Sequence, residues 1–417
     1  MSRIAVIGAG ISGMAAAYLL SRKHEVSLFE REPRLGGHTH THQIETSCGV
    51  LPIDTGFIVH NNRTYPNLVR LFRKLGIQRQ PSDMSFGVSC RETGFEYSTR
   101  GVRGFLGSNL LRLRQYRLFS QILRFNRAAQ ALIHNPANID LTLGEYLRAN
   151  GFQGDFSHYY LNPIAAAVWS TSLEEIEQFP AFTLFRFLDN HGLLGITTQA
   201  QWYVLKGGSS VYIEPLTAPY QQRIRLGARI EGVSRNARGV QIALEGRQPE
   251  QFDEVVFACH APQAIQLLKD ASPLERSVMG NFRTSRNRSV LHTDSRLLPR
   301  RPEARASWNY HLGTSRRSAT LTYHMNRLQG LPTREDYCVT LNDTGALDPL
   351  RVLRDMAYFH PLYTADAVRA QSRWSEISGR QHTHFCGAYW FYGFHEDGLN
   401  SAIRVAEKLG ASWEAAV

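Results

Sequence analysis

The chain has 417 residues, 43% of them hydrophobic and 20% charged, so its size allows two domains and its composition is that of a soluble globular protein. The formal net charge is +11, but only five of the 47 basic residues are lysines, and the arginine bias of a GC-rich genome explains this excess without a nucleic-acid partner. No run of about 20 apolar residues could span a bilayer, and five cysteines without a CxxC pair exclude a zinc ribbon and favour a cytoplasmic location.

A strand, a glycine-rich turn, a helix and a second strand are predicted at the start of the chain. Residues 3–7 form an apolar run rich in β-branched side chains and lead directly into Gly8-Ala9-Gly10-Ile11-Ser12-Gly13. Helix formers dominate 14–21, and a second apolar strand is expected over 25–29, followed by Glu30. This order predicts a βαβ unit of Rossmann type and hence a dinucleotide-binding domain.

The three glycines of this motif have separate physical roles. Gly8 permits a tight turn, Gly10 lets the backbone approach a pyrophosphate, and Gly13 lets the helix pack close to the strand. Phosphates are then expected at the helix N-terminus, where free N–H groups and the helix dipole attract anions. Glu30 is placed to accept hydrogen bonds from ribose hydroxyls, which disfavours a 2′-phosphate and hence NADP.

Two further segments, 31–38 and 385–399, resemble the flavin amine oxidase superfamily. In that superfamily the first segment brings backbone close to the flavin, and the second starts a helix that faces the pyrophosphate and the pyrimidine end of the flavin. The resemblance implies FAD, bound non-covalently because no cysteine lies in the superfamily's covalent-attachment motif. It assigns cofactor binding to Arg31, Gly36, Gly37, His38, Ile230, Gly387, Glu396, Asp397, Gly398 and Leu399.

The position of these segments implies a discontinuous FAD-binding domain. We expect this Rossmann-type α/β domain to comprise 1–80, 201–275 and 380–417. An amine-oxidase-like α+β substrate domain with an antiparallel sheet is expected to comprise 81–200 and 276–379.

Within the substrate domain, helices are expected over 109–133 and 139–150, and strands over 289–293, 319–323 and 337–341. Arginines of the first helix fall on one face and apolar residues on another. This pattern fits a core-packed helix with a solvated face or, alternatively, a peripheral contact with an anionic membrane.

Several segments resemble a narrower group, which contains bacterial NAD/FAD-binding oxidoreductases and the N-terminal flavoprotein-like region of plant cyclopropane fatty acid synthases. The matching segments are 54–59, 61–66, 82–86, 168–170, 201–202, 206–207, 306–309 and 385–399. Members often accompany lipid methyltransferases, which are therefore an expected partner. The resemblance implies a lipid-like, fatty acyl substrate that is oxidised, desaturated or isomerised by hydride transfer to the flavin. A non-catalytic FAD-binding accessory protein of a lipid methyltransferase is an alternative.

Amine oxidation is a further alternative, disfavoured by two departures from the superfamily. Many amine oxidases hold a lysine near the flavin N5, whereas this sequence has no lysine between Lys269 and Lys408 and has Arg288 or a neighbour on the matching strand. His395 stands where one tyrosine of the amine-guiding aromatic cage would. We expect His395 to be the catalytic, proton-carrying residue, with capping of the closing helix as its alternative role.

The other substrate-site candidates are His60, Trp202 and Tyr392. His38, His40 and His42 alternate as they would on one face of a strand, which is a spacing used by metal sites. No carboxylate or thiolate partner lies at ligand spacing, so we expect no metal. A second GxGxxG is absent, so no NAD(P)H site is expected, and the electron acceptor stays open between oxygen, a quinone and a carrier protein.

Overall fold

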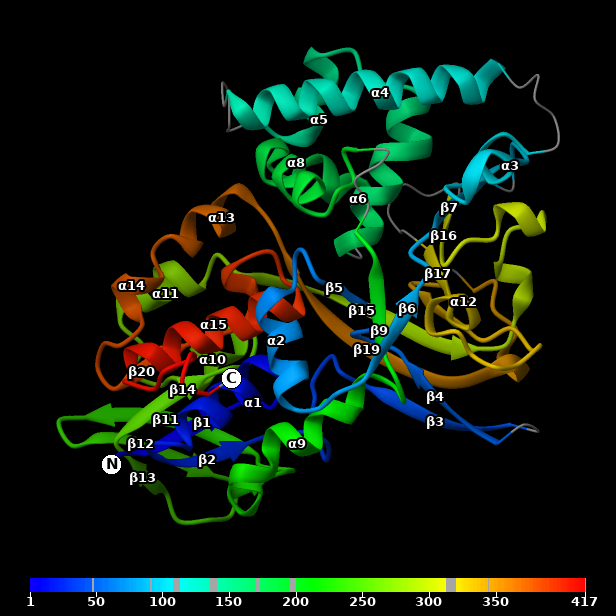
Figure 1. Cartoon of the computed structure of the whole chain (residues 1–417). Coiled ribbons are helices and arrows are strands. Elements are labelled where there is room, and N and C mark those ends of the chain that lie inside the picture. The colour runs from blue at the N-terminus through cyan, green and yellow to red at the C-terminus, as the bar shows by residue number, and fades with distance from the viewer. Residues whose placement is uncertain are drawn as a thin grey trace.

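The chain folds around two large β-sheets, one parallel and one mainly antiparallel, with a layer of helices above the second (Figure 1). Both termini lie beside the parallel sheet (Figure 1). The computed structural model describes residues 1–46, 49–90, 92–107, 113–135, 141–169, 173–195, 200–312, 320–343 and 345–416.

The parallel sheet draws its strands from both ends of the chain. Its order is β10-β2-β1-β14-β20, and all neighbouring strands run parallel. The strands are β1 (Arg3–Ile7), β2 (Glu25–Phe29), β10 (Ile224–Arg225), β14 (Glu254–Phe257) and β20 (Thr383–Phe385). After its first residue, each of β1 and β2 is buried throughout, which explains why both strands are predominantly apolar.

Helices and a small antiparallel sheet, β11-β12-β13, share one hydrophobic core with the parallel sheet. Helix α1 (Ile11–Leu20) joins β1 to β2 and is buried along its whole length. The other elements of this core are α2 (Pro66–Lys74), α9 (Ile213–Thr217), β11 (Ile230–Asn236), β12 (Gly239–Leu244), β13 (Glu250–Phe252), α10 (Ala261–Leu267), α11 (Pro273–Met279), α13 (Ala365–Gln371), α14 (Trp374–Ile377) and α15 (His395–Lys408). Helices α1 and α15 pack on each other, which joins the two ends of the chain.

The second large sheet has the order β19-β15-β18-β17-β16-β7-β8, and only β16 and β7 pair in parallel. Its strands are β7 (Phe86–Cys90), β8 (Phe95–Ser98), β15 (Arg283–His292), β16 (Trp308–Leu312), β17 (Thr320–His324), β18 (Cys338–Leu341) and β19 (Val352–Leu362). Two small sheets, β3-β4 and β5-β9-β6, complete the strands of the described chain. Their strands, with one nearby helix, are β3 (Thr41–Thr46), β4 (Gly49–Asp54), β5 (His60–Asn61), β6 (Arg79–Ser82), β9 (Trp202–Leu205) and α12 (Met325–Gln329).

A helical layer lies above the antiparallel sheet (Figure 1). It consists of α3 (Gly101–Leu106), α4 (Leu113–His134), α5 (Leu143–Ala149), α6 (Asn162–Trp169), α7 (Leu173–Glu177) and α8 (Ala181–Asn190). Its core is rich in aromatic rings, and the ring centroid of Phe125 lies 5.1 Å from those of both Phe156 and Phe185. A capping box between Thr142 and Glu145 fixes the start of α5.

The fold class expected from the sequence is confirmed, since a parallel α/β unit stands beside an antiparallel sheet with its own helices. Strands of the parallel sheet fall within 1–80, 201–275 and 380–417, and those of the antiparallel sheet within 81–200 and 276–379. In the sheet β5-β9-β6, strand β6 crosses the expected boundary between residues 80 and 81, and the domain bounds stay a prediction.

Some sequence positions used above lie outside the described residues. They are Cys48, 109–112, 139–140, Ser170 and Ala319. Among the described residues, no helix is both long and apolar enough to cross a membrane.

Candidate active site

The turn between β1 and α1 leaves room beside the helix N-terminus. Gly8 has φ +105°, and its N–H donates to the carbonyl of Phe29 at 2.8 Å. A Cβ on Gly13 would lie 1.8 Å from the carbonyl oxygen of Gly8, whereas a Cβ on Gly10 would meet nothing within 4 Å. Gly13 therefore allows close contact between helix and strand, and Gly10 borders open space at the uncapped N–H groups of α1.

A second glycine pair lies directly against this turn. The N–H of Gly36 donates to the carbonyl of Ala9 at 2.8 Å. Gly37 has φ +57°, and a Cβ on it would lie 3.1 Å from the Cα of Gly10. The Arg34 guanidinium donates to the carbonyl of Gly37 at 2.8 Å and holds this conformation. The two glycine segments are thus placed to contact one extended cofactor.

Glu30 stands beside the turn, at the end of β2. Its carboxylate accepts the backbone N–H of Ala9 at 2.7 Å and that of Glu32 at 2.8 Å. The side chains of Arg31 and Glu32 form an exposed ion pair at 3.4 Å, so the structure turns Arg31 toward solvent. Ile230, the first residue of β11, is partly buried on the core of the parallel sheet.

We expect Glu30→Ala to weaken FAD binding by about 10- to 150-fold, because a charge-assisted hydrogen bond to a ribose hydroxyl contributes about 1.5–3 kcal/mol. Glu32→Ala is the matched control, since an exposed ion pair contributes at most about 1 kcal/mol. Dissociation constants from fluorescence titration of apoprotein with FAD measure both. Equal losses in the two variants would show that Glu30 does not contact the ribose.

The C-terminal segment brings the start of α15 against the start of α1. A Cβ on Gly398 would lie 2.7 Å from the Ile11 side chain and 2.9 Å from the Ser12 hydroxyl oxygen. Gly387 has φ +152°, follows β20, and donates its N–H to the Ser401 hydroxyl at 2.8 Å. The first and last segments of the chain therefore lie in contact beside the glycine turn.

The two carboxylates at the start of α15 are occupied within the protein. Glu396 accepts the N–H groups of Asn67 and Leu68, at the start of α2, at 3.0 and 2.8 Å. Asp397 accepts the N–H of Phe394 at 2.9 Å, and burial raises the pKa of its carboxyl to about 7. The backbone of this turn, rather than its acidic side chains, is left for a cofactor. Leu399, the next apolar residue, is fully buried.

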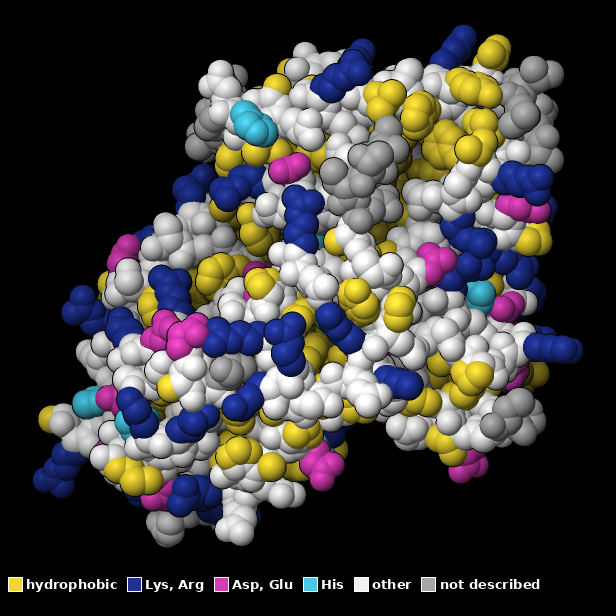
Figure 2. All heavy atoms as spheres, viewed as in Figure 1, with side chains coloured by type: hydrophobic (Ala, Val, Ile, Leu, Met, Phe, Trp, Pro, Cys, Tyr) yellow, Lys and Arg dark blue, Asp and Glu magenta, His cyan; other side chains and the backbone are white. Residues whose placement is uncertain are grey.

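A cavity of about 830 Å³ extends from His38, which follows the second glycine pair, to the molecular surface. His38 and His395 line the buried end of the cavity. Val102 and Phe119 line its exposed end, and their exposed fractions are 68% and 43%. In Figure 2 hydrophobic side chains gather around a hollow between α3 and the start of α4. The described residues that line the cavity include no Asp, Glu, Lys or Arg.

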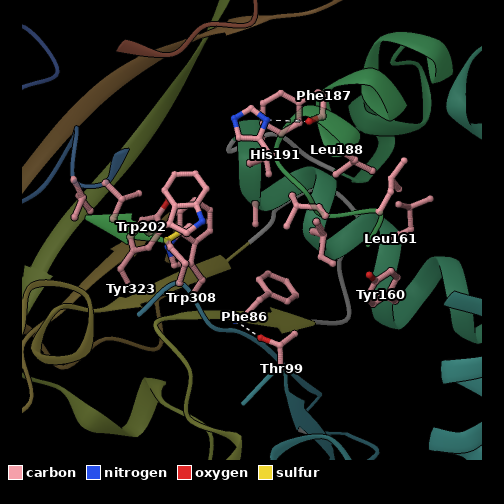
Figure 3. A pocket seen from close by; sticks show the side chains of 18 of the residues that line it. Phe86, Thr99, Tyr160, Leu161, Phe187, Leu188, His191, Trp202, Trp308 and Tyr323 are labelled. Atoms are coloured by element: carbon pink, nitrogen blue, oxygen red, sulfur yellow. Dashed lines mark hydrogen bonds between the residues drawn. The ribbon is translucent and has the colours of Figure 1, made fainter. Parts of the chain in front are cut away.

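The cavity walls come from elements that are far apart in the sequence (Figure 3). Phe86 of β7 and Trp308 of β16 rise from the antiparallel sheet, and Leu188 of α8 faces them from the helical layer (Figure 3). The substrate-site candidates Trp202 and Tyr392 also line it. Such a wall binds an apolar chain by burying it and offers very few polar anchors.

His60 is not among the described residues that line this cavity, and its role as a substrate-site candidate stays a prediction. On β5 it pairs with Tyr203, whereas Asn61 pairs with Trp202. Side chains of directly paired residues share a face and alternate along a strand, so His60 lies on the side opposite Trp202. It is fully buried, with its ring 5.4 Å from that of Phe72.

His395 is the first residue of α15 and is almost fully buried in the cavity wall. Its Nε2 lies 2.9 Å from the Thr39 hydroxyl and 3.3 Å from the Tyr212 hydroxyl, and its ring stacks on Phe57 at 3.7 Å between centroids. Burial lowers the pKa of His395 to about 3. The imidazole is therefore neutral near pH 7 and makes hydrogen bonds through Nε2, and its proton-carrying role stays a prediction.

We expect His395→Phe to retain FAD and to lower turnover by up to about 30-fold, because the side chain at the inner end of the cavity loses two hydrogen bonds that hold it, each worth about 1 kcal/mol. Since the folded pKa of about 3 lies below the ordinary value of 6.5, the fold disfavours protonation, and this residue costs stability as pH falls from 6.5 toward 3. The variant should therefore lose less stability on acidification. Above about pH 5, the pH dependence of its rate should have the same shape as that of the wild type. A change in the shape of the pH–rate profile near neutral pH would support a proton-carrying role for His395. Tyr212→Phe is the control for the hydrogen bond alone.

Tyr358 and His360 of β19 are among the cavity residues that the sequence analysis did not name. Their rings each lie 5.3 Å from that of His38, between centroids, and burial lowers the pKa of His360 to about 4. Their alternate spacing on a strand was the available signal.

Arg288, on the neighbouring strand β15, instead pairs with Asp355 at 2.7 Å and is about half exposed.

The alternating histidines separate in the structure. His40 and His42 lie side by side, with ring centroids 4.0 Å apart, whereas His38 precedes β3 and turns into the cavity. Within the described ranges, no three His, Cys, Asp or Glu residues form a group that could hold a metal ion.

Comparison with known families agrees with this geometry. Residues 11–301 match the sequence model of the family described as flavin containing amine oxidoreductase. The chain belongs to this family. Its members are described as flavin-containing oxidoreductases.

Individual relatives differ in what their names say they act on. The "Putative flavin-containing monoamine oxidase AofH" of Mycobacterium tuberculosis is 29% identical over 262 residues, which cover 59% of this chain and 54% of that protein. The zeta-carotene desaturase of Zea mays is 23% identical over 231 residues, covering 51% of this chain and 39% of the desaturase. The chain thus aligns with about half the length, or less, of these curated relatives. The crystal structure of a CLA-producing fatty acid isomerase from P. acnes superposes with a TM-score of 0.70 at 15% identity, covering 98% of each chain, and shows a shared fold.

Proposed function

We propose that the chain oxidises, desaturates or isomerises a lipid-like substrate whose fatty acyl chain enters the cavity. The observation that carries this proposal is the uncharged wall: about 830 Å³ of space lined by aromatic and aliphatic side chains, with no Asp, Glu, Lys or Arg among the described lining residues. A cavity of this size lies within the range of small-molecule sites, about 300–1,000 Å³. Burying an acyl chain there gains about 0.8 kcal/mol for each methylene group.

The residues of the glycine turn between β1 and α1 fit the phosphates and ribose of FAD. Open space beside Gly10, the uncapped N-terminus of α1 and the Glu30 carboxylate are the donor and acceptor set that a dinucleotide needs. FAD supplies a two-electron acceptor when bound. The protein contributes an apolar wall that excludes water and orients an acyl chain, with His395 held by Thr39 and Tyr212 at the inner end.

Anaerobic mixing of the FAD-loaded protein with lipids tests this function. The probes are linoleic acid and a phosphatidylglycerol with unsaturated acyl chains, with putrescine and benzylamine as amine controls. Flavin bleaching by a lipid identifies oxidation or desaturation, and a changed double bond in the recovered lipid without bleaching identifies isomerisation. Bleaching by the amines alone would overturn the proposal. Inertness toward every probe would favour the accessory role beside a lipid methyltransferase.

Amine oxidation is the second candidate, because relatives and structural neighbours include proteins named as amine oxidases. Cyclohexylamine oxidase from Brevibacterium oxydans superposes with a TM-score of 0.70 at 17% identity, covering 98% of this chain and 99% of the oxidase. A protonated amine would nevertheless enter a cavity without a carboxylate among its described lining residues, and burying an unpaired charge is costly.

We propose that FAD is bound without a covalent link. Burial raises the pKa of Cys259 to about 12 and that of Cys386 further, so both thiols stay protonated and are poor nucleophiles. Heat denaturation should release all of the flavin into the supernatant, as measured by its absorbance. Colour retained by the denatured chain would contradict this, and His38 would then be the first residue to examine.

A further inference from the structure

The outer end of the cavity carries an exposed apolar surface, here called the mouth patch. It consists of Val102, Leu113, Tyr116 and Phe119, which are 68%, 70%, 49% and 43% exposed. Three of them, all except Leu113, also line the cavity, so the patch is continuous with the cavity interior. Single exposed apolar side chains are normal, but a contiguous group at the entrance of a pocket marks an interaction surface. Figure 2 shows hydrophobic side chains gathered there, with Lys or Arg side chains at the margins.

The chain around the mouth patch is strongly basic. Between Glu96 and Asp140 the sequence contains seven arginines and no Asp or Glu. Arg103 of α3 and Arg117 of α4 are exposed and make no ion pair with any described residue. Arg114 is neutralised by Asp155 at 2.6 Å. Unpaired positive charge therefore lies on the same two helices as the mouth patch, at Arg103 and Arg117, whereas the cavity interior has none among its described residues.

This division of charge fits a lipid with an anionic headgroup. An acyl chain can be buried in the uncharged interior, but a phosphate cannot, because no described lining residue would compensate its charge. The headgroup therefore stays at the surface, where the arginines attract it. Apolar side chains protruding among cations are also the pattern of segments that lie in the interface of a membrane. An acidic protein would match the arginines but leave the protruding leucine and aromatic rings unexplained.

We propose that the mouth patch docks on the surface of a bilayer that contains anionic phospholipid, so that acyl chains pass from the membrane into the cavity tail first. The docking rests on the surface of α3 and α4 alone, whereas the entry of an acyl chain rests on the proposed function.

Flotation of the FAD-loaded protein with vesicles tests the docking. Vesicles of phosphatidylcholine alone are compared with vesicles that also contain phosphatidylglycerol. We expect the protein to float with the anionic vesicles only, and to be released when salt rises from about 0.1 to about 1 M, because the screening length falls from about 10 to about 3 Å.

Charge-reversal variants test whether binding depends on the arginines beside the mouth patch or on the overall positive charge of the protein. Arg103→Glu/Arg117→Glu should weaken partition into anionic vesicles by about 25-fold or more, since each arginine near an anionic surface contributes about fivefold. Leu113→Ser should weaken it by about tenfold through lost apolar burial. Arg238→Glu/Arg247→Glu reverses the same charge at exposed turns of the β11-β12-β13 sheet and should leave partition unchanged.

The possible outcomes separate the docking from the proposed function. Absence of the wild-type protein from anionic vesicles, or equal losses in both double variants, would overturn the docking. Binding to an acidic carrier protein but not to vesicles would also overturn it and assign the mouth patch to a protein partner. Vesicle binding without turnover of any lipid would leave the docking in place and overturn the proposed function instead. Turnover of detergent-dispersed lipid by Arg103→Glu/Arg117→Glu, combined with loss of turnover on vesicles, would support both.

Discussion

Replacing Ile164 by Trp is expected to lower kcat/KM for a lipid substrate by about 10³-fold while FAD stays bound. Ile164 lies on α6, is only partly buried, and lines the cavity. A Trp ring there that displaces about five methylene groups of an acyl chain removes about 4 kcal/mol of burial, at about 0.8 kcal/mol for each. This loss acts on the transition state as well as on the ground state, so it is measured as kcat/KM.

Ile164→Val is the matched control, because it keeps the cavity open at the same position. A buried Ile→Val change costs about 0.5–1.5 kcal/mol of stability, so this variant should fold and keep nearly full turnover. The flavin spectrum of both variants reports whether FAD remains bound. Full lipid turnover by Ile164→Trp would show that the acyl chain does not enter this cavity.

The dinucleotide-binding unit could be predicted almost residue by residue from the sequence. Strands β1 and β2 have the expected bounds. Parallel strands buried on both faces are apolar, and here Gly8 marks the end of the first strand and Glu30 the end of the second. Helix α1 begins at Ile11 rather than at the expected 14, since its first turn is made by the glycine motif itself. The spacing of the motif predicts these bounds because a bound dinucleotide fixes where the strand, the turn and the helix must lie.

The cavity could not be predicted in the same way. Its walls combine side chains from β7, α4, α6, α8, β16 and β19, and no local pattern shows that these elements face one space. The apolar stripe of the helix expected over 109–133 does pack as expected, with Leu118, Ile122 and Phe125 buried. The sequence could not show that Phe119, one residue beyond Leu118, is exposed and also lines the cavity.

The histidines illustrate the same limit. The sequence made His395 the catalytic candidate and His60 one of three substrate-site candidates. In the structure His395 lies in the cavity wall, whereas His60 is not among the described lining residues, because strand pairing puts it on the side opposite Trp202. Tyr358 and His360 reach the cavity only because β19 pairs with β15 along its full length and presents alternate residues to one side. Burial, which sets the pKa of each ring, depends on the assembled molecule.

Gly10→Ala is expected to stabilise the apoprotein and to weaken FAD binding, two effects of opposite sign. Gly10 has φ −72° and ψ −179°, a conformation that alanine adopts freely, and its Cβ would meet no protein atom within 4 Å. Loss of glycine's freedom in the unfolded chain should then raise the free energy of unfolding by about 0.4–1 kcal/mol. If the open space holds the pyrophosphate, the methyl group crowds it at a cost of about 1–3 kcal/mol, or about 5- to 150-fold in affinity.

Gly13→Ala provides the contrast within the same motif. Its Cβ would lie 1.8 Å from the carbonyl oxygen of Gly8, a backbone atom that cannot move without separating α1 from β1, so this variant should be destabilised even without cofactor. Thermal unfolding of the two apoproteins and FAD titration of each give the four values needed. If the cofactor phosphates lie beside Gly10, the Gly10→Ala apoprotein should melt no lower than the wild-type apoprotein. The same variant should bind FAD more weakly. Unchanged FAD affinity in Gly10→Ala would place the phosphates elsewhere and remove the glycine turn from the cofactor site.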